Sequence, residues 1–338
     1  MTHGSTPSAP HEFSMQLGDA DLTARIADGM GKVEDLLYER LSVGEDFITD
    51  KVTHLVKAGG KRFRPLVALL CSEFGPEPGV ENVVKGAAIT EMVHLATLYH
   101  DDVMDEAARR RGVESANHRW GNTVAILAGD ILFAHASRLM SEINTETVRH
   151  FADTFAQLVT GQMRETVGAR GGDPVEHYLK VIEEKTGILI ASAAYLGSRN
   201  AGASDEIVER CEKIGGAIGM VFQIVDDIID IFSSPTESGK VPGTDLREGV
   251  LTLPVLYALR DGSAAGEELR GLLTGPLTRD GDVARALELI AMTDGRDRAL
   301  ADVHRYLAIA EEQLDHLPDI PANRALRQLS AYTVERVG

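Results

Sequence analysis

Apolar residues recur at helical spacing through nearly all of this 338-residue chain. Between residues 17 and 38, for example, Leu22, Ile26 and Met30 recur every four positions and therefore share one face of a helix. Similar stretches cover residues 80–105, 124–140, 150–167 and 211–232. No segment alternates apolar and polar residues around a hairpin turn, and aromatic residues make up only 5% of the chain. These patterns predict an all-α fold.

Short breaks separate the predicted helices, and no change in composition marks a domain boundary. Residues 75–79 are predicted to form a turn, and Asp173 is predicted to cap a helix that begins at Pro174. Residues 233–249 form the longest break, and loops of this length often cover a functional site. We expect a disordered leader over residues 1–12 and a single all-α domain over residues 13–338.

The charge balance excludes several classes of function. The chain has 34 basic and 52 acidic residues, a formal net charge of −18, whereas nucleic-acid binding requires a basic face. Two distant cysteines, Cys71 and Cys211, indicate buried thiols in a reducing compartment and no disulfide framework. Residues 1–13 lack the basic start and apolar run that a signal peptide would have, and no uninterrupted apolar run approaches the ~18 residues of a membrane span. We therefore expect a cytoplasmic protein with no nucleic-acid partner and no membrane span.

Two aspartate-rich motifs with the same D-D-x-x-D spacing are the strongest chemical signal. The first contains Asp101, Asp102 and Asp105, and the second contains Asp226, Asp227 and Asp230. Each lies in an apolar helical stretch, where carboxylates are costly to bury unless they are paired or bind a metal. A solvated acidic face is the alternative, but it does not explain two motifs of identical spacing. The pattern is not an EF-hand, and it favours Mg²⁺, which combines one or two carboxylates with water and substrate phosphates.

Basic residues stand where an acidic protein needs positive charge to bind a phosphate. In the segment GGKRFRP, Gly60 allows close backbone approach, and Lys61 and Arg64 can converge on one anion. Further candidates are Arg110 and Arg111 after the first motif, His94 two helical turns before Asp101, Lys185 and Thr186 at a bend near Gly187, Gln223 one turn before Asp227, and Lys240 in the long loop. Each of them also has a simpler explanation as a solvated, ion-paired or core residue.

In this order and spacing, the segments GGKRFRP, HDDVMD, RRG, KTG and FQIVDDIID resemble the trans-isoprenyl (polyprenyl) diphosphate synthase family. The stretch MVHLATLYHDDVMDEA resembles long-chain synthases of quinone biosynthesis. The resemblance implies a single large helical bundle around a central cavity, of the isoprenoid synthase type, and a homodimer. It implies condensation of isopentenyl diphosphate with an allylic diphosphate, such as farnesyl or geranylgeranyl diphosphate. It also implies about three Mg²⁺ ions per active site, which assist departure of the allylic diphosphate.

The same resemblance implies a role for each candidate residue. Metal binding is assigned to Asp101, Asp105, Asp226 and Asp230, and the catalytic set is completed by Asp102, Asp227 and Lys185. Isopentenyl diphosphate is assigned to Gly60, Lys61, Arg64, His94 and Arg111, and the allylic substrate to Arg110, Lys185, Thr186, Gln223 and Lys240. One departure is Val250, which stands where many relatives carry a lysine.

The residues before the first motif bear on the length of the product. In the family, a bulky aromatic residue near Ala96 and Thr97 blocks the growing chain, so these small residues imply a product from heptaprenyl to decaprenyl. Such a product fits a menaquinone side chain. Tyr99 lies roughly 160° around the helix from Asp101, and it leaves a geranylgeranyl product open.

Three other functions are alternatives to a long-chain synthase. A short-chain synthase making farnesyl or geranylgeranyl diphosphate is the first. A non-catalytic regulatory subunit would usually have lost aspartates from these motifs, whereas this chain keeps both sets. A cyclising terpene synthase would normally replace the second D-D-x-x-D motif.

Overall fold

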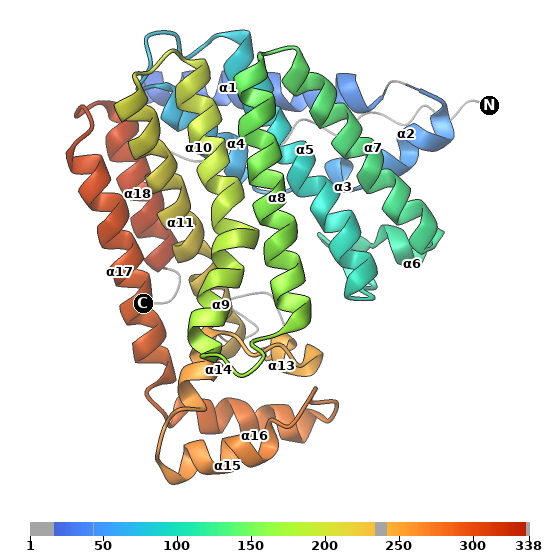
Figure 1. Ribbon diagram of the computed structural model, residues 1–338, viewed down its shortest axis with the longest axis vertical. Coiled ribbons are helices and arrows are strands. Elements are labelled where there is room, and N and C mark those ends of the chain that lie inside the picture. Colours follow the sequence, from blue (N-terminus) through green and yellow to red (C-terminus); the bar gives the residue numbers. More distant parts are fainter. Residues whose placement is uncertain (1–16, 43, 234–241, 336–338) are drawn as a thin grey trace. The chain divides into compact units, whose positions relative to one another are not determined.

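The computed structural model describes residues 17–42, 44–233 and 242–335, and nearly all of them are helical (Figure 1). The all-α fold is thereby confirmed. The described residues form two compact units. Unit 1 comprises residues 17–42, 44–151, 193–209 and 319–325, and unit 2 comprises the remaining described residues. The single domain over residues 13–338 stays a prediction. The leader, Lys240 and most of the predicted loop at 233–249 lie outside the described residues.

Unit 1 is built around α5 (Glu81–Met104), which the first aspartate motif terminates. The other helices wholly in this unit are α1 (Ala20–Leu41), α2 (Asp46–Val52), α3 (His54–Lys57), α4 (Phe63–Ser72), α6 (Ala116–Trp120) and α7 (Asn122–Ser141). Helices α1, α4, α6 and α7 contact α5, which is buried on most sides. A Cβ atom at Gly197 would lie 1.9 Å from the carbonyl oxygen of Ala68, so only glycine permits this close approach.

A short hairpin follows the first aspartate motif. Strands β1 (Arg109–Arg110) and β2 (Val113–Glu114) pair antiparallel, and Arg111 and Gly112 form the turn between them. Both turn residues have positive φ, 51° and 78°, as the tight turns that favour hairpins require. The sequence analysis predicted no hairpin, because strands of two residues show no alternation. The turn fixes the position of the Arg111 backbone, from which its side chain extends.

Unit 2 contains α9 (Pro174–Ile182), the π-helix η1 (Glu183–Gly187), α13 (Thr244–Glu248), α14 (Leu253–Ala258), α15 (Ala264–Leu272), α16 (Asp280–Ala291) and α17 (Gly295–Asp315). Four helices contribute residues to both units, namely α8 (Thr145–Val167), α10 (Ile188–Asn200), α11 (Asp205–Phe232) and α18 (Pro321–Glu335). The core of unit 2 packs apolar residues of α11, such as Ile224 and Ile228, against α14 and α17. Asp173 accepts hydrogen bonds from the backbone of Val175 and Glu176, which confirms the predicted cap before Pro174.

Helix α7 is the one helix in the described ranges that is long and apolar enough to cross a membrane. Its apolar run is not continuous, because Asp130 and Arg138 interrupt it, and for that reason the sequence predicts no span here. Core helices of soluble proteins also meet the criteria of length and composition. Helix α7 packs along α5, where a Cβ atom at Gly129 would lie 2.3 Å from Nε2 of His100.

Candidate functional site

The glycine loop between α3 and α4 has an unusual backbone. Gly59 and Gly60 have φ values of 83° and 150°, and Arg62 is left-handed at 47°. A Cβ atom at Gly60 would lie 2.9 Å from Cζ of Arg111, so glycine lets the arginine lie against the loop. In unit 1, the described non-glycine residues with positive φ are Arg62, Glu106 and Arg111. Such strained residues gather at functional sites, and all three lie in or beside the predicted motifs.

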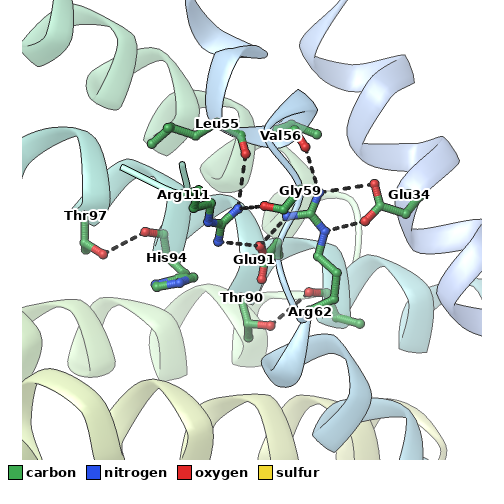
Figure 2. A network of polar contacts seen from close by, with 11 residues as sticks. Glu34, Leu55, Val56, Gly59, Arg62, Thr90, Glu91, His94, Thr97 and Arg111 are labelled. Atoms are coloured by element: carbon green, nitrogen blue, oxygen red, sulfur yellow. Dashed lines mark hydrogen bonds and ion pairs between the residues drawn. The ribbon is translucent and has the colours of Figure 1, made fainter. Parts of the chain in front are cut away.

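The buried carboxylate of Glu91 organises two arginines around this loop (Figure 2). Arg62 donates to Glu91 at 2.8 Å and to the carbonyl oxygen of Val56 at 3.1 Å, and it also pairs with Glu34. Glu91 lies on α5 and is 1% exposed. The sequence analysis assigned no role to Arg62 or Glu91. A glutamate in an otherwise apolar helical stretch, three residues before His94, was the available signal.

Arg111 fastens the same loop from the hairpin turn (Figure 2). It donates to the carbonyl oxygens of Leu55 at 3.1 Å and Gly59 at 2.5 Å, and a guanidinium nitrogen lies 3.5 Å from Glu91. Carbonyl groups at the end of α3 lack partners within the helix, and the arginines provide them. Arg111 and the glycine loop, which the sequence analysis assigned to one substrate, are therefore in contact.

Arg64 adds positive charge to this part of unit 1, and His94 adds a neutral imidazole beside it. The Nε atom of Arg64 is buried and has no hydrogen-bond partner. Burial, assisted by the charge of Arg111 and opposed by that of Glu91, lowers the pKa of Arg64 to about 10. Burial and the charges of Arg64 and Arg111 hold the pKa of His94 well below its usual value, so its imidazole is neutral at pH 7.

The cluster of charged side chains around Glu91 therefore has more positive than negative charge. Lys61 is exposed, and Arg62, Arg64 and Arg111 are buried or partly buried, whereas two carboxylates, Glu34 and Glu91, pair with the cluster. A buried guanidinium without a complete set of acceptors is costly, and a polyvalent anion supplies both acceptors and charge. This arrangement suits a diphosphate.

The first aspartate motif divides its carboxylates between two environments. The backbone N–H of Asp105 donates to the carbonyl oxygen of Asp101 at 2.8 Å, so the helical turn continues through Asp105 and both side chains share one face. Asp101 is half-buried and Asp105 is exposed. Asp102 is fully buried and accepts a hydrogen bond of 2.6 Å from Nε of Arg110.

Asp102 thus anchors the hairpin that carries Arg110. Burial raises the pKa of the Asp102 carboxyl, although the charge and hydrogen bond of Arg110 oppose this. Its backbone carbonyl accepts from the Asn117 side chain at 2.9 Å and from the N–H of Ala107 at 3.0 Å. Its Oδ2 atom is buried without a hydrogen-bond partner. The middle aspartate therefore has a structural position, whereas the outer two lie at the accessible end of α5.

The second motif, in unit 2, has two buried carboxylates and one that is more accessible. Asp226 is half-buried, whereas Asp227 and Asp230 are buried. Asp227 accepts hydrogen bonds from the hydroxyl of Tyr178 and from Nε2 of Gln223, the latter at 3.0 Å. Asp230 accepts from the backbone N–H groups of Thr244 at 3.3 Å and Asp245 at 3.2 Å, at the beginning of α13. A carboxylate has about four acceptor positions, so Asp230 keeps capacity for a further partner.

Residues 183–187, where the sequence suggests a bend, form the π-helix η1, a geometry that often marks functional sites. Thr186 donates to Oε1 of Gln223 at 3.1 Å, so it joins the network of Asp227. Lys185 pairs with Glu165 at 2.5 Å, and the buried Glu184 pairs with Arg164. The structure thus brings together Thr186, Gln223 and Asp227, all of which the sequence analysis selected.

Tyr178 belongs to the same network and was not predicted. It lies seven residues before Lys185, that is, two helical turns, and this spacing was the only signal. Its hydroxyl donates to Asp227. Tyr178 therefore connects α9 to the second aspartate motif.

The donor set for a metal consists of carboxylate oxygens. Within the described residues, no group of three or more His, Cys, Asp or Glu side chains is gathered into a metal site. Mg²⁺ needs no such group, because water and substrate phosphates complete its coordination. In unit 1, the pair Asp101 and Asp105 on one helix face fits that mode of binding. In unit 2, the half-buried Asp226 of α11 fits it as well.

The residues selected for product length lie on α5. Ala96 and Tyr99 are fully buried, and the Thr97 hydroxyl donates to the carbonyl oxygen of His94 at 2.8 Å. The Tyr99 hydroxyl donates to the carbonyl oxygen of Lys51 at 2.6 Å. Val250, which departs from the family pattern, is 42% exposed.

Comparison with known proteins agrees with this geometry. The family model described as Polyprenyl synthetase matches residues 45–290. The chain is 53% identical to nonaprenyl diphosphate synthase of Mycobacterium tuberculosis over 325 residues, which cover 96% of this chain and 97% of that protein.

Two solved structures are also similar. Geranylgeranyl pyrophosphate synthase from Corynebacterium glutamicum, crystallised with calcium and isoprenyl diphosphate, has a TM-score of 0.89 and 60% identity. This match covers 96% of this chain and 100% of that one. Decaprenyl diphosphate synthase from Rhodobacter capsulatus has a TM-score of 0.84 and 34% identity, with coverage of 94% and 99%.

Proposed function

The chain belongs to the polyprenyl synthetase family and is a prenyltransferase, and from this premise we propose that it adds isopentenyl diphosphate head to tail to an allylic diphosphate. The cationic cluster around Glu91 is the observation that supports this most directly. Its orphaned Arg64 Nε and its excess of positive charge suit a diphosphate. Lys61, Arg64, His94 and Arg111, with the backbone at Gly60, are the proposed ligands of isopentenyl diphosphate.

The allylic diphosphate is assigned to Mg²⁺ and to a second group of residues. The proposed metal ligands are Asp101, Asp105, Asp226 and Asp230, and the proposed diphosphate contacts are Arg110, Lys185, Thr186, Gln223 and Lys240. When bound, Mg²⁺ supplies positive charge that stabilises the departing diphosphate. Asp102 and Asp227 orient this machinery through Arg110 and Gln223. The neighbour crystallised with calcium and isoprenyl diphosphate supports dependence on a divalent cation.

A product from heptaprenyl to decaprenyl, for a menaquinone side chain, is the proposed outcome. The small side chain of Ala96, on the buried face of α5, supports it, as does the similarity to nonaprenyl and decaprenyl diphosphate synthases. A geranylgeranyl product is the second candidate, because one structural neighbour with that activity is 60% identical.

The protein is also proposed to form a homodimer in the cytoplasm. Ile126 and Leu127 of α7 are 43% and 54% exposed, and adjacent exposed apolar side chains on one helix suit an interface. Cys71 and Cys211 are buried thiols, as expected in a reducing compartment. Light scattering of the purified protein, and of I126E as a variant with a disrupted face, measures the oligomeric state.

Product analysis tests the activity. The purified protein is incubated with Mg²⁺, isopentenyl diphosphate and farnesyl diphosphate, and the dephosphorylated alcohols are resolved by length. A product of heptaprenyl length or longer is expected, and chelation by EDTA should abolish it until Mg²⁺ is restored. A product that stops at geranylgeranyl establishes the second candidate. A folded protein that elongates nothing would overturn the proposal.

A further inference from the structure

We propose that Tyr99 is a positioning residue for the isopentenyl diphosphate site and does not limit the length of the product. This inference rests on the proposed function, because it assigns Tyr99 to the site around Glu91 and Arg111. Tyr99 lies on α5, two residues before Asp101, and its side chain is fully buried.

The Tyr99 hydroxyl bridges the junction of α2 and α3. It donates to the carbonyl oxygen of Lys51, in the last turn of α2, at 2.6 Å. It accepts from the backbone N–H of Leu55, in the first turn of α3, at 3.3 Å. Lys51 stands at the end of α2 and Leu55 at the start of α3, where the regular helical hydrogen bonds are incomplete. One hydroxyl therefore holds the start of a four-residue helix that is too short to be stable alone.

The same short helix carries the carbonyl groups that hold the arginines of the site. Leu55 donates its N–H to the Tyr99 hydroxyl. Its carbonyl oxygen accepts from Arg111 at 3.1 Å (Figure 2). The next residue, Val56, accepts from Arg62 at 3.1 Å. Tyr99 and Arg111 are thus linked through a single residue. Loss of the hydroxyl would free the segment against which Arg111 is aligned.

The hydrogen bonds of the Tyr99 hydroxyl also argue against a role for this residue in limiting product length. Its polar end is bonded to the backbone of the α2–α3 junction. A hydrocarbon chain cannot replace these hydrogen bonds, and leaving them unmade inside the protein is costly. The Ala96 side chain has no polar group that could form such hydrogen bonds, and product length remains assigned to Ala96.

Two variants separate the hydroxyl from the ring. In Y99F, which removes only the hydroxyl, KM for isopentenyl diphosphate is expected to rise about threefold to tenfold, the range of one hydrogen bond. The KM for farnesyl diphosphate and kcat should stay within about twofold. In Y99L, which also removes the ring, the product should keep the wild-type length.

The chain offers a readout without activity and a matched control. Its single tryptophan, Trp120, lies 4.9 Å from the ring of His54 and 5.2 Å from Nζ of Lys51, so its fluorescence should shift in Y99F. Tyr257 donates another hydrogen bond from a buried tyrosine, 2.5 Å to Asp302 in unit 2. The Y257F variant should lose stability but keep both the KM for isopentenyl diphosphate and the tryptophan spectrum.

Hydrogen exchange on the wild-type protein gives a test that needs no variant. A peptide covering residues 51–59 is expected to exchange slowly before ligand is added, and more slowly with isopentenyl diphosphate. An unprotected peptide would overturn the inference, as would an unchanged KM in Y99F or a longer product from Y99L. If titration calorimetry shows that the wild type does not bind isopentenyl diphosphate, the proposed function itself has failed, and the inference falls with it.

Discussion

Arg62 places a guanidinium nitrogen 2.8 Å from a carboxylate oxygen of Glu91, and both side chains are almost fully buried (Figure 2). The pair lies at the point where the glycine loop meets α5. Arg111 approaches the same carboxylate and Glu34 also pairs with Arg62, so two carboxylates face the four cations Lys61, Arg62, Arg64 and Arg111. The remaining positive charge is therefore held in place before any anion binds, which lowers the cost of ordering the site.

Replacement of Glu91 by glutamine should lower the free energy of unfolding by about 3 kcal/mol, because it leaves buried guanidinium charge without its partner. Urea unfolding measures this loss. The matched variant is E34Q: Glu34 pairs with the same arginine but is 27% exposed, so the loss should be about 1 kcal/mol or less. Equal losses of unfolding free energy in the two variants would show that Glu91 stabilises the cluster no more than Glu34 does.

The aspartates of the first motif should separate activity from stability. In D105N the exposed carboxylate is lost, so kcat should fall by about 100-fold or more while the unfolding free energy changes by less than about 0.5 kcal/mol. In D102N the buried partner of Arg110 is lost, and stability should fall by about 1–3 kcal/mol. Steady-state kinetics and urea unfolding measure the two effects. A D102N variant that is as stable as the wild type but inactive would contradict the structural role of Asp102.

Tyr178 should affect the allylic substrate selectively. In Y178F, Asp227 loses a hydrogen bond and the chain of contacts to Gln223 and Thr186 is loosened. The KM for farnesyl diphosphate should rise about twofold to tenfold, with the KM for isopentenyl diphosphate unchanged. Tyr332 is 60% exposed, so Y332F serves as the control with wild-type constants. A uniform rise of both KM values in Y178F would argue against a local role.

His94 should make stability depend on pH below about 6.5. Its pKa in the folded protein is depressed by burial and by arginine charges, so in acid the unfolded chain binds a proton that the folded protein does not. The contribution is present above about pH 6.5 and is lost as pH falls toward the folded pKa, by at most about 1.4 kcal/mol per pH unit. Urea unfolding at pH 7.5, 6.5 and 5.5 should show a flatter profile for H94Q, whereas parallel profiles would refute this assignment.

Ala96 should control product length in a graded manner. A phenylalanine at this buried position adds bulk on α5 five residues before Asp101, so A96F should give a shorter product than the wild type. A96L should give an intermediate length, and overpacking should cost about 1–3 kcal/mol in stability. Chromatography of the dephosphorylated products measures the change. A wild-type product from a folded A96F would remove Ala96 from the path of the growing chain.

Several features were predictable because they depend on local sequence. Helical periodicity predicted α1, α5, α7, α8 and α11 near the positions where they are observed. The reason is that the repeat of apolar residues every 3.6 positions can be read from the sequence without knowledge of the fold. The bend at Lys185 was predicted from a glycine after a charged turn, and the structure shows a π-helix there. The hairpin was missed, because two-residue strands have no period and the turn depends on positive φ at Arg111.

The sequence by itself determined the helical class, the two aspartate motifs and the family, because repeated spacing and motif order are properties of the chain alone. Only the tertiary structure decided which acidic residues are anchors and which are accessible, and it alone identified Glu91. Such roles depend on partners far away in sequence: Arg111 meets Leu55 across 56 residues, and Tyr99 meets Lys51 across 48. Spacing shows which face of a helix a residue occupies, but only packing determines what lies opposite that face.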